Sequence, residues 1–99
     1  MKRYLITIDI DTTKKENPSP LYDEVEKFLE SSFAKYCKPL KNVYLIATNN
    51  SSVSTSSIRE NIKTILTYDD LVFVCELNGN YASWNYTSIN EEINAFFKD

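Results

Sequence analysis

An alternating apolar run near the amino terminus constrains the fold more than any other stretch. Within RYLITIDID, at residues 3–11, every second position is aromatic or isoleucine: Tyr4, Ile6, Ile8 and Ile10. Successive side chains of a β-strand point to opposite faces, so this spacing predicts a strand with one wholly apolar face. The other face would carry Leu5, Thr7, Asp9 and Asp11. We expect a central strand with helices over its isoleucine face and two carboxylates at its carboxyl end.

Size and composition predict one domain over residues 1–99. The chain is 42% hydrophobic and 25% charged, which is an ordinary globular composition. A chain of this length builds one modest core and no second one.

The amino-terminal run and the cysteines predict the compartment. MKRYLITIDI is interrupted by Asp9 and has no small-residue cleavage site, which favours a strand over a signal peptide. No apolar segment approaches the roughly 20 residues of a membrane helix. Cys37 and Cys75 form no CxxC pair and are expected to act as small buried hydrophobes. We expect a reduced, cytoplasmic protein that does not bind membranes.

Charge and histidine content limit the chemistry. The net charge is −3 and the isoelectric point is about 4.9, whereas nucleic-acid binding requires clustered Lys and Arg. Binding to nucleic acid is therefore expected to be weak or absent. The chain has no histidine, which excludes His-dependent acid–base catalysis and most zinc sites. Any chemistry must come from carboxylates, Lys, Tyr, Ser or Cys.

The first half of the chain predicts a helix and two strands after the opening strand. Ser19 as N-cap and Pro20 at the first helical position predict a helix to about residue 31. The next segment, SFAKYCK at 32–38, suits either a continued helix or a short edge strand, of which we favour the strand. A turn is expected at 38–42. VYLIAT, at 43–48, is apolar on both faces, as in a central strand.

The second half predicts a helix, a strand and a closing helix. A cap at Ser54 or Thr55 leads into isoleucines at helical spacing. Asp69 and Asp70 are expected to start a strand that continues through LVFVCEL. Asn78-Gly79 is a tight-turn signal, and the aromatic residues at 81–86 indicate an edge strand or a covering arm. A capping box at 88–91 then begins a helix with one apolar stripe, formed by Ile89, Ile93, Phe96 and Phe97.

This order predicts an α+β, ferredoxin-like βαββαβ sandwich with a C-terminal aromatic arm and a short helix. Strands one and three would be central. Helices in such a fold cover one face of the sheet, so the second face, apolar around Leu5 and Thr7, needs a partner or the tail to cover it.

Four segments in order, RYLITIDI, LKNVYLI, SSIRENIKTIL and DDLVFVCELNGNYASW, together resemble the small Cas2-like proteins of the SinR family. The resemblance implies a ferredoxin-like homodimer associated with CRISPR adaptation or another mobile-element defence. Some members of this family are described as metal-dependent endonucleases that use an aspartate at the end of strand one, a position that Asp9 matches. The chain departs from the family in its acidic charge and in the long polar loop before the first helix.

Two functions stay open at this point. We favour a non-catalytic homodimeric interaction module, with a further protein partner as an open alternative, because the chain offers one candidate acid and no basic groove. The alternative is a divalent-metal-dependent endonuclease of RNA or DNA, in which Asp9 is the catalytic residue and a ligand of Mg²⁺. An aspartate at a strand end also serves commonly as a turn acceptor, and Asp11 is expected to make such a contact. For Tyr81, Trp84 and Tyr86, packing of the tail over the sheet is favoured over base stacking.

Overall fold

The computed structural model describes residues 1–13, 17–84 and 87–98. Seven elements follow in the order β1 (Lys2–Asp9), α1 (Ser19–Ser32), β2 (Lys35–Leu40), β3 (Val43–Thr48), α2 (Thr55–Lys63), β4 (Leu71–Leu77) and α3 (Thr87–Phe97). The strands form one sheet in the order β2-β3-β1-β4, and every neighbouring pair is antiparallel. The fold is therefore α+β, with β1 and β3 in the interior positions, and it is compatible with the predicted ferredoxin-like arrangement. No helix in the described part of the chain could cross a bilayer.

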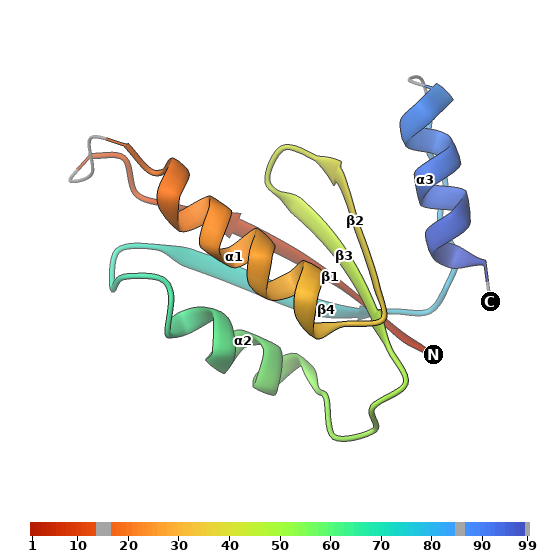
Figure 1. Cartoon of the computed structure of the whole chain (residues 1–99), viewed down its shortest axis with the longest axis horizontal. Helices are drawn as coiled ribbons and strands as arrows, with labels where there is room; N and C mark the ends of the chain where they lie inside the picture. Colours follow the sequence, from red (N-terminus) through yellow and green to blue (C-terminus); the bar gives the residue numbers. More distant parts are fainter. Residues whose placement is uncertain (14–16, 85–86, 99) are drawn as a thin grey trace.

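The isoleucine face of β1 is the centre of the main core. α1 and α2 lie on one side of the sheet and α3 on the other (Figure 1). The side chains of Tyr4, Ile6, Ile8 and Ile10 are at most 2% exposed and pack with Val25 and Leu29 of α1 and with Ile58 and Ile62 of α2. This confirms the predicted orientation of the strand. Burial of each such side chain contributes about 1.5–3 kcal/mol.

Two predicted boundaries in the first half of the chain are wrong. Ser19 is already the first residue of α1, and Pro18 is the N-cap. The side-chain oxygen of Asn17 accepts the Ser19 N–H at 3.1 Å, so an Asx turn takes the role expected of a serine cap. β1 ends at Asp9, two residues earlier than predicted.

The segment at 32–38 does contribute an edge strand, β2, as favoured. The turn predicted at 38–42 is shorter, because β2 continues to Leu40 and the turn falls at Lys41 and Asn42. An irregularity in the β2–β3 register between Cys37 and Leu40 accommodates Pro39. A proline without an N–H is tolerated at such a point of an edge strand.

In the second half, the cap at Ser54 is confirmed. Ser54 Oγ accepts the Ser57 N–H at 3.1 Å and Ser57 Oγ accepts the Ser54 N–H at 2.8 Å, which closes a capping box.

Ser88 is not an N-cap, because α3 begins at Thr87. Gly79 has a φ of +96°, which glycine adopts without strain. No strand follows it within residues 78–84, so an edge strand there is wrong, while residues 85 and 86 lie outside the described residues.

A small polar cluster joins α1 to β2 and β3. The Tyr44 hydroxyl and Lys38 Nζ each donate to Glu26 Oε2 at 3.2 Å, and the Tyr36 ring stacks on Tyr44 with centroids 6.3 Å apart. Burial, with Glu26 as the next cause, raises the pKa of both hydroxyls, that of Tyr36 to about 12. Both tyrosines are therefore neutral in the folded protein well above pH 7.

Leu29→Ala should lower the free energy of unfolding by about 2–5 kcal/mol, because Leu29 is fully buried and its removal leaves a cavity under α1. Leu40→Ala is the matched control, since Leu40 is 66% exposed and should change stability by no more than about 0.5 kcal/mol. Urea unfolding followed by circular dichroism measures both. Equal effects would contradict the assigned core.

Stability should fall as the pH rises from 10 toward 12. The Tyr36 pKa is raised from its ordinary value of 10.0 to about 12, so the folded state holds a proton that the unfolded chain releases above pH 10. The contribution is complete below pH 10 and disappears as the pH passes the folded pKa. Tyr36→Phe should reduce this loss in urea unfolding between pH 9 and pH 12, with the part due to Tyr44 remaining, whereas Tyr68→Phe, at a fully exposed position, should leave the profile unchanged.

Candidate functional site

The second face of the sheet is divided into a covered half and an open half. Residues that pair across antiparallel strands share a face, so the register sorts this face into rows. The first row is Lys35, Ala47, Arg3 and Leu77, and the second is Cys37, Leu45, Leu5 and Cys75. The third row is Leu40, Val43, Thr7 and Phe73, and the last is Asp9 and Leu71. Ile93 and Phe96 of α3 pack on the first two rows.

Two cations of the first row hold the carboxyl end of α3. Lys35 Nζ donates to the carbonyl oxygens of Ala95 and Phe96, at 3.3 and 3.2 Å, and also to that of Lys98. Arg3 Nη2 donates to the Phe97 carbonyl oxygen at 3.0 Å, and its guanidinium lies 5.7 Å from the centre of the Phe97 ring. The last carbonyls of a helix carry partial negative charge and favour such cations. α3 is thereby fixed over one end of the sheet.

We call the third and last rows the open half-face. Its apolar side chains are largely in solvent: Leu40 is 66% exposed, Phe73 60% and Leu71 67%. Thr7 and Val43 are partly buried, and Asp9, which is exposed, is its one charged residue. Large apolar side chains clustered in this way on a sheet mark a contact surface. The expectation that a tail covers the second face is thus met only for its first two rows.

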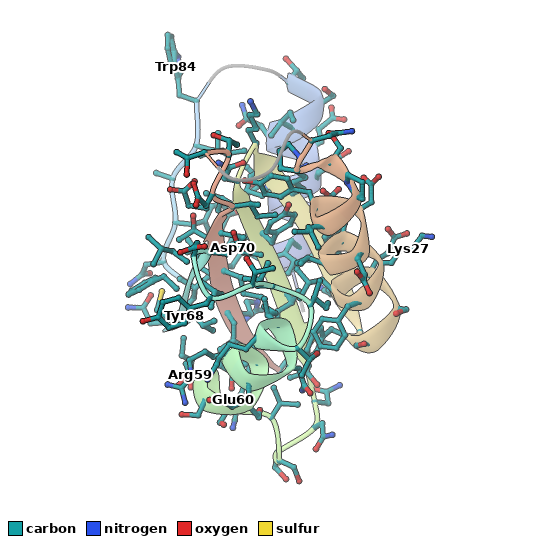
Figure 2. The ribbon with its side chains drawn as sticks, turned by 90° about the vertical axis from the view of Figure 1, so that its left-hand side faces the viewer. Lys27, Arg59, Glu60, Tyr68, Asp70 and Trp84 are labelled. Atoms are coloured by element: carbon teal, nitrogen blue, oxygen red, sulfur yellow. The ribbon has the colours of Figure 1, made fainter. Side chains whose placement is uncertain are left out.

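An apolar groove of about 450 Å³ adjoins the open half-face. It lies between the sheet, residues 80–84 and the inner side of α3, and its walls include Leu5, Val43, Leu45, Leu77, Ile93 and Phe97. Tyr81 stacks on Phe97 with centroids 4.1 Å apart and donates to Asn94 Oδ1 at 2.6 Å, so it packs on α3, whereas the prediction placed the tail over the sheet. It is wrong for Trp84, which is 89% exposed and projects away from the protein (Figure 2). Tyr86 lies outside the described residues.

The structure separates the two predicted carboxylates. Asp11 lies beyond the end of β1, and its Oδ1 accepts the N–H and the hydroxyl of Thr13 at 2.9 and 2.7 Å, the Asx-type contact that was predicted. Asp9 remains on the strand, where it pairs with Leu71, and its exposed carboxylate has no hydrogen bond to another described residue. In the described ranges, no three His, Cys, Asp or Glu side chains gather in a way that could hold a metal ion.

Asp70 is a structural carboxylate whose role the sequence did not reveal. Instead of starting β4, it precedes the strand and accepts the Asp11 N–H at 2.9 Å and the Thr67 N–H at 2.8 Å. It therefore joins the loop after β1 to the loop before β4 and shapes the end of the sheet that carries Asp9. The spacing of a threonine three residues before an aspartate was the available signal.

The two cysteines differ in their surroundings. Cys37 is buried under α3, as predicted, and burial followed by the charge of Glu92 raises the pKa of its thiol. Cys75, in the second row beside Leu5, is only partly buried, so its expected burial is not complete.

The open half-face combines exposed apolar side chains with a single carboxylate, a composition that suits the binding of another molecule better than catalysis. Comparisons of the chain with protein-family models, with curated proteins and with solved structures found no match.

Proposed function

We propose that this chain is a homodimeric, non-catalytic interaction module of Cas2-like type, with the open half-face packed against that of a second copy. The observation that carries the proposal is the pair Leu71 and Phe73, which stand two residues apart on one face of β4 and are both more than half exposed. Burying such side chains contributes about 1.5–3 kcal/mol each. Exposure of these side chains to water therefore costs free energy, and a partner that covers them would recover it.

A second copy is the partner that fits this surface best. Two-fold contacts join the same patch on both subunits, which requires a patch that can pack on itself. The open half-face meets this requirement because it is built from strands and is mainly apolar. α3 blocks a full overlay of two sheets, so the copies would meet at their open ends with the two α3 helices at opposite ends of the dimer. Leu40 would be part of this contact, and the exposed Trp84, which lines the adjoining groove, would extend it.

Charge and resemblance support the same proposal. The net charge of −3 disfavours phosphate, which points to protein as the binding partner. The resemblance to Cas2-like proteins supports a ferredoxin-like homodimer, with a role in CRISPR or another mobile-element defence as part of the proposal.

Phe73→Glu should convert a dimer into a monomer, because it places a charge in the centre of the apolar contact. Multi-angle light scattering at micromolar concentrations should give twice the chain mass for the wild type and the chain mass for the variant. Tyr68→Glu is the matched control, because Tyr68 is a fully exposed aromatic residue outside the open half-face, and it should remain dimeric. A monomeric wild type across this range would refute the proposal.

A second candidate, a divalent-metal-dependent endonuclease, is favoured by the position of Asp9. Asp9 is exposed and lies in the last row of the open half-face, so self-association there could bring its two copies close together. Like charges at short range raise each other's pKa unless a cation lies between them. A dimer with close copies would thus favour a bridging Mg²⁺ ligated by carboxylate oxygens.

Under the main proposal, neither the wild type nor Asp9→Asn should cleave RNA or DNA with Mg²⁺ or Mn²⁺ at any pH between 6 and 9. Gel analysis of labelled substrates provides the measurement, and Asp23→Asn, at an exposed position of α1, serves as the control. Cleavage by the wild type and by Asp23→Asn that is lost in Asp9→Asn, with the dimer intact, would establish the second candidate instead.

A further inference from the structure

The outer edge of β2 lies in a trough of about 720 Å³. β2 is an edge strand of the sheet, and no described strand pairs with its outer side. The six consecutive residues 33–38 all line the trough. Side chains of a strand alternate between faces, so a cavity lined by consecutive residues must run along the edge of the strand and open to both faces.

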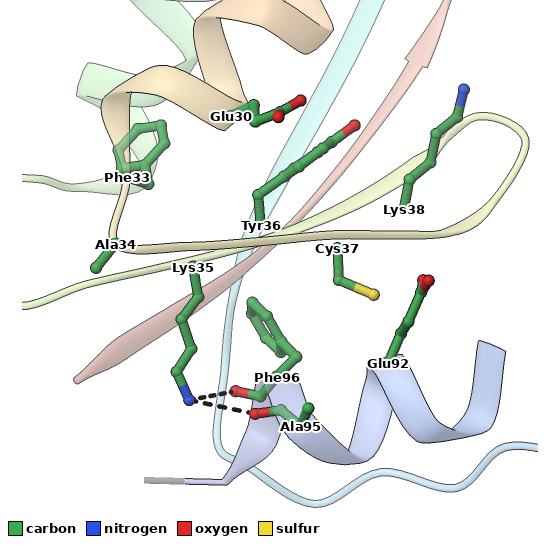
Figure 3. A pocket seen from close by; sticks show the side chains of 10 residues that line it. All are labelled: Glu30, Phe33, Ala34, Lys35, Tyr36, Cys37, Lys38, Glu92, Ala95 and Phe96. Atoms are coloured by element: carbon green, nitrogen blue, oxygen red, sulfur yellow. Dashed lines mark hydrogen bonds between the residues drawn. The ribbon is translucent and has the colours of Figure 1, made fainter. Parts of the chain in front are cut away.

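Helices form a wall on each side of this edge. Glu30 of α1 lies on the face with Tyr36, while Glu92, Ala95 and Phe96 of α3 lie on the face with Cys37 (Figure 3). An unpaired edge strand presents outward N–H and C=O groups that can pair with another chain. The two walls would confine such a chain to the line of the strand.

Among the charged side chains that line the trough, the two lysines have partners and the two glutamates have none within the described part of the chain. Lys35 is engaged with the carbonyl oxygens at the end of α3, and Lys38 forms an ion pair with Glu26. The side chains of Glu30 and Glu92 are exposed, and neither carboxylate has a hydrogen bond or ion pair with a described residue. The pKa values of the Tyr36 hydroxyl and the Cys37 thiol are both raised, and burial is the largest cause of each shift. The next cause is the charge of nearby carboxylates, Glu26 and Glu30 for Tyr36 and Glu92 for Cys37. The available charge on both walls is therefore negative.

We propose that the edge of β2 accepts an extended segment of another protein as a fifth strand, and that this segment carries two basic side chains an odd number of residues apart. Pairing of the backbone would supply affinity, as in other strand-addition complexes. The odd spacing follows from strand geometry, because two side chains of a strand point to opposite faces only when they are an odd number of residues apart. One basic group would then reach Glu30 and the other Glu92.

The position of Pro39 limits where this strand can pair. Pro39 has no N–H, and the register is irregular between Cys37 and Leu40. The added strand should therefore pair along residues 35–37. This edge and β4, the strand with Leu71 and Phe73, lie at opposite ends of the sheet order. The inference extends beyond self-association and does not depend on it.

The test uses the full chain and short synthetic peptides of alternating threonine and valine that carry two lysines. Peptides with lysines three positions apart should bind about fivefold more tightly than those with lysines two positions apart, measured by isothermal titration calorimetry. The double variant Glu30→Gln, Glu92→Gln should lose this preference. Glu91→Gln, an exposed neighbour on α3 that does not line the trough, should retain it.

Two further measurements separate strand addition from general attraction between charges. Hydrogen exchange should slow at those amides of residues 35–37 that point away from β3 when the odd-spaced peptide is bound, and N-methylation of the peptide backbone should abolish binding. Absence of binding, equal affinity for both spacings, indifference to N-methylation, or protection confined to β4 would each overturn the proposal.

Discussion

The attachment of α3 by Arg3 and Lys35 is the interaction on which both proposed binding surfaces depend. These cations stand in one row at one end of the sheet, and they bind the carbonyl oxygens where α3 ends. α3 has 11 residues and is therefore only about 16 Å long. A helix of this length held at one end cannot cover the whole face, so the rows of Thr7 and Asp9 stay open. The same helix supplies one wall of the trough beside β2.

The two faces of the sheet differ in how completely their apolar residues are buried. On the isoleucine face, two helices bury a continuous core around Tyr4 and Ile6. On the second face, a smaller cluster around Leu45 and Phe96 ends where α3 ends. The main core buries the isoleucine face, whereas Leu71 and Phe73 of β4 stay exposed and are available for contacts outside the chain. Phe73 and Leu71 add little to the stability of the isolated fold, because folding leaves them mostly in water.

The two surfaces use different physical interactions. The open half-face offers apolar area with little directional character, which suits a second copy of the same patch. The β2 edge offers backbone donors and acceptors between two acidic walls, which suits an extended basic segment. The added strand would pair along residues 35–37 of β2, whereas Leu71 and Phe73 lie on β4 at the other end of the sheet order, so occupation of one surface leaves the other accessible. A dimer could in this way carry two partner segments, one on each subunit.

The sequence by itself determined the elements whose signals are local. The alternation of Tyr4, Ile6 and Ile8 identified the central strand and its buried face, VYLIAT gave β3 with its bounds, and Ser54 marked the start of α2. Local signals failed where a side chain accepts a hydrogen bond that propensity does not specify: Asn17 accepts the N–H of Ser19, the expected cap, and Asp70 accepts the N–H of Thr67 in the loop before β4.

Only the tertiary structure decided which half of the second face is covered. The rows on that face join residues far apart in the chain, such as Arg3 with Ala47 and Leu77, or Thr7 with Phe73. No local pattern specifies such a register, because it results from the simultaneous packing of all strands and helices. The exposure of Trp84, the solvent position of Asp9 and the trough between Glu30 and Glu92 follow from that packing. The sequence predicted which faces are apolar, and the fold alone determined which of them remain open.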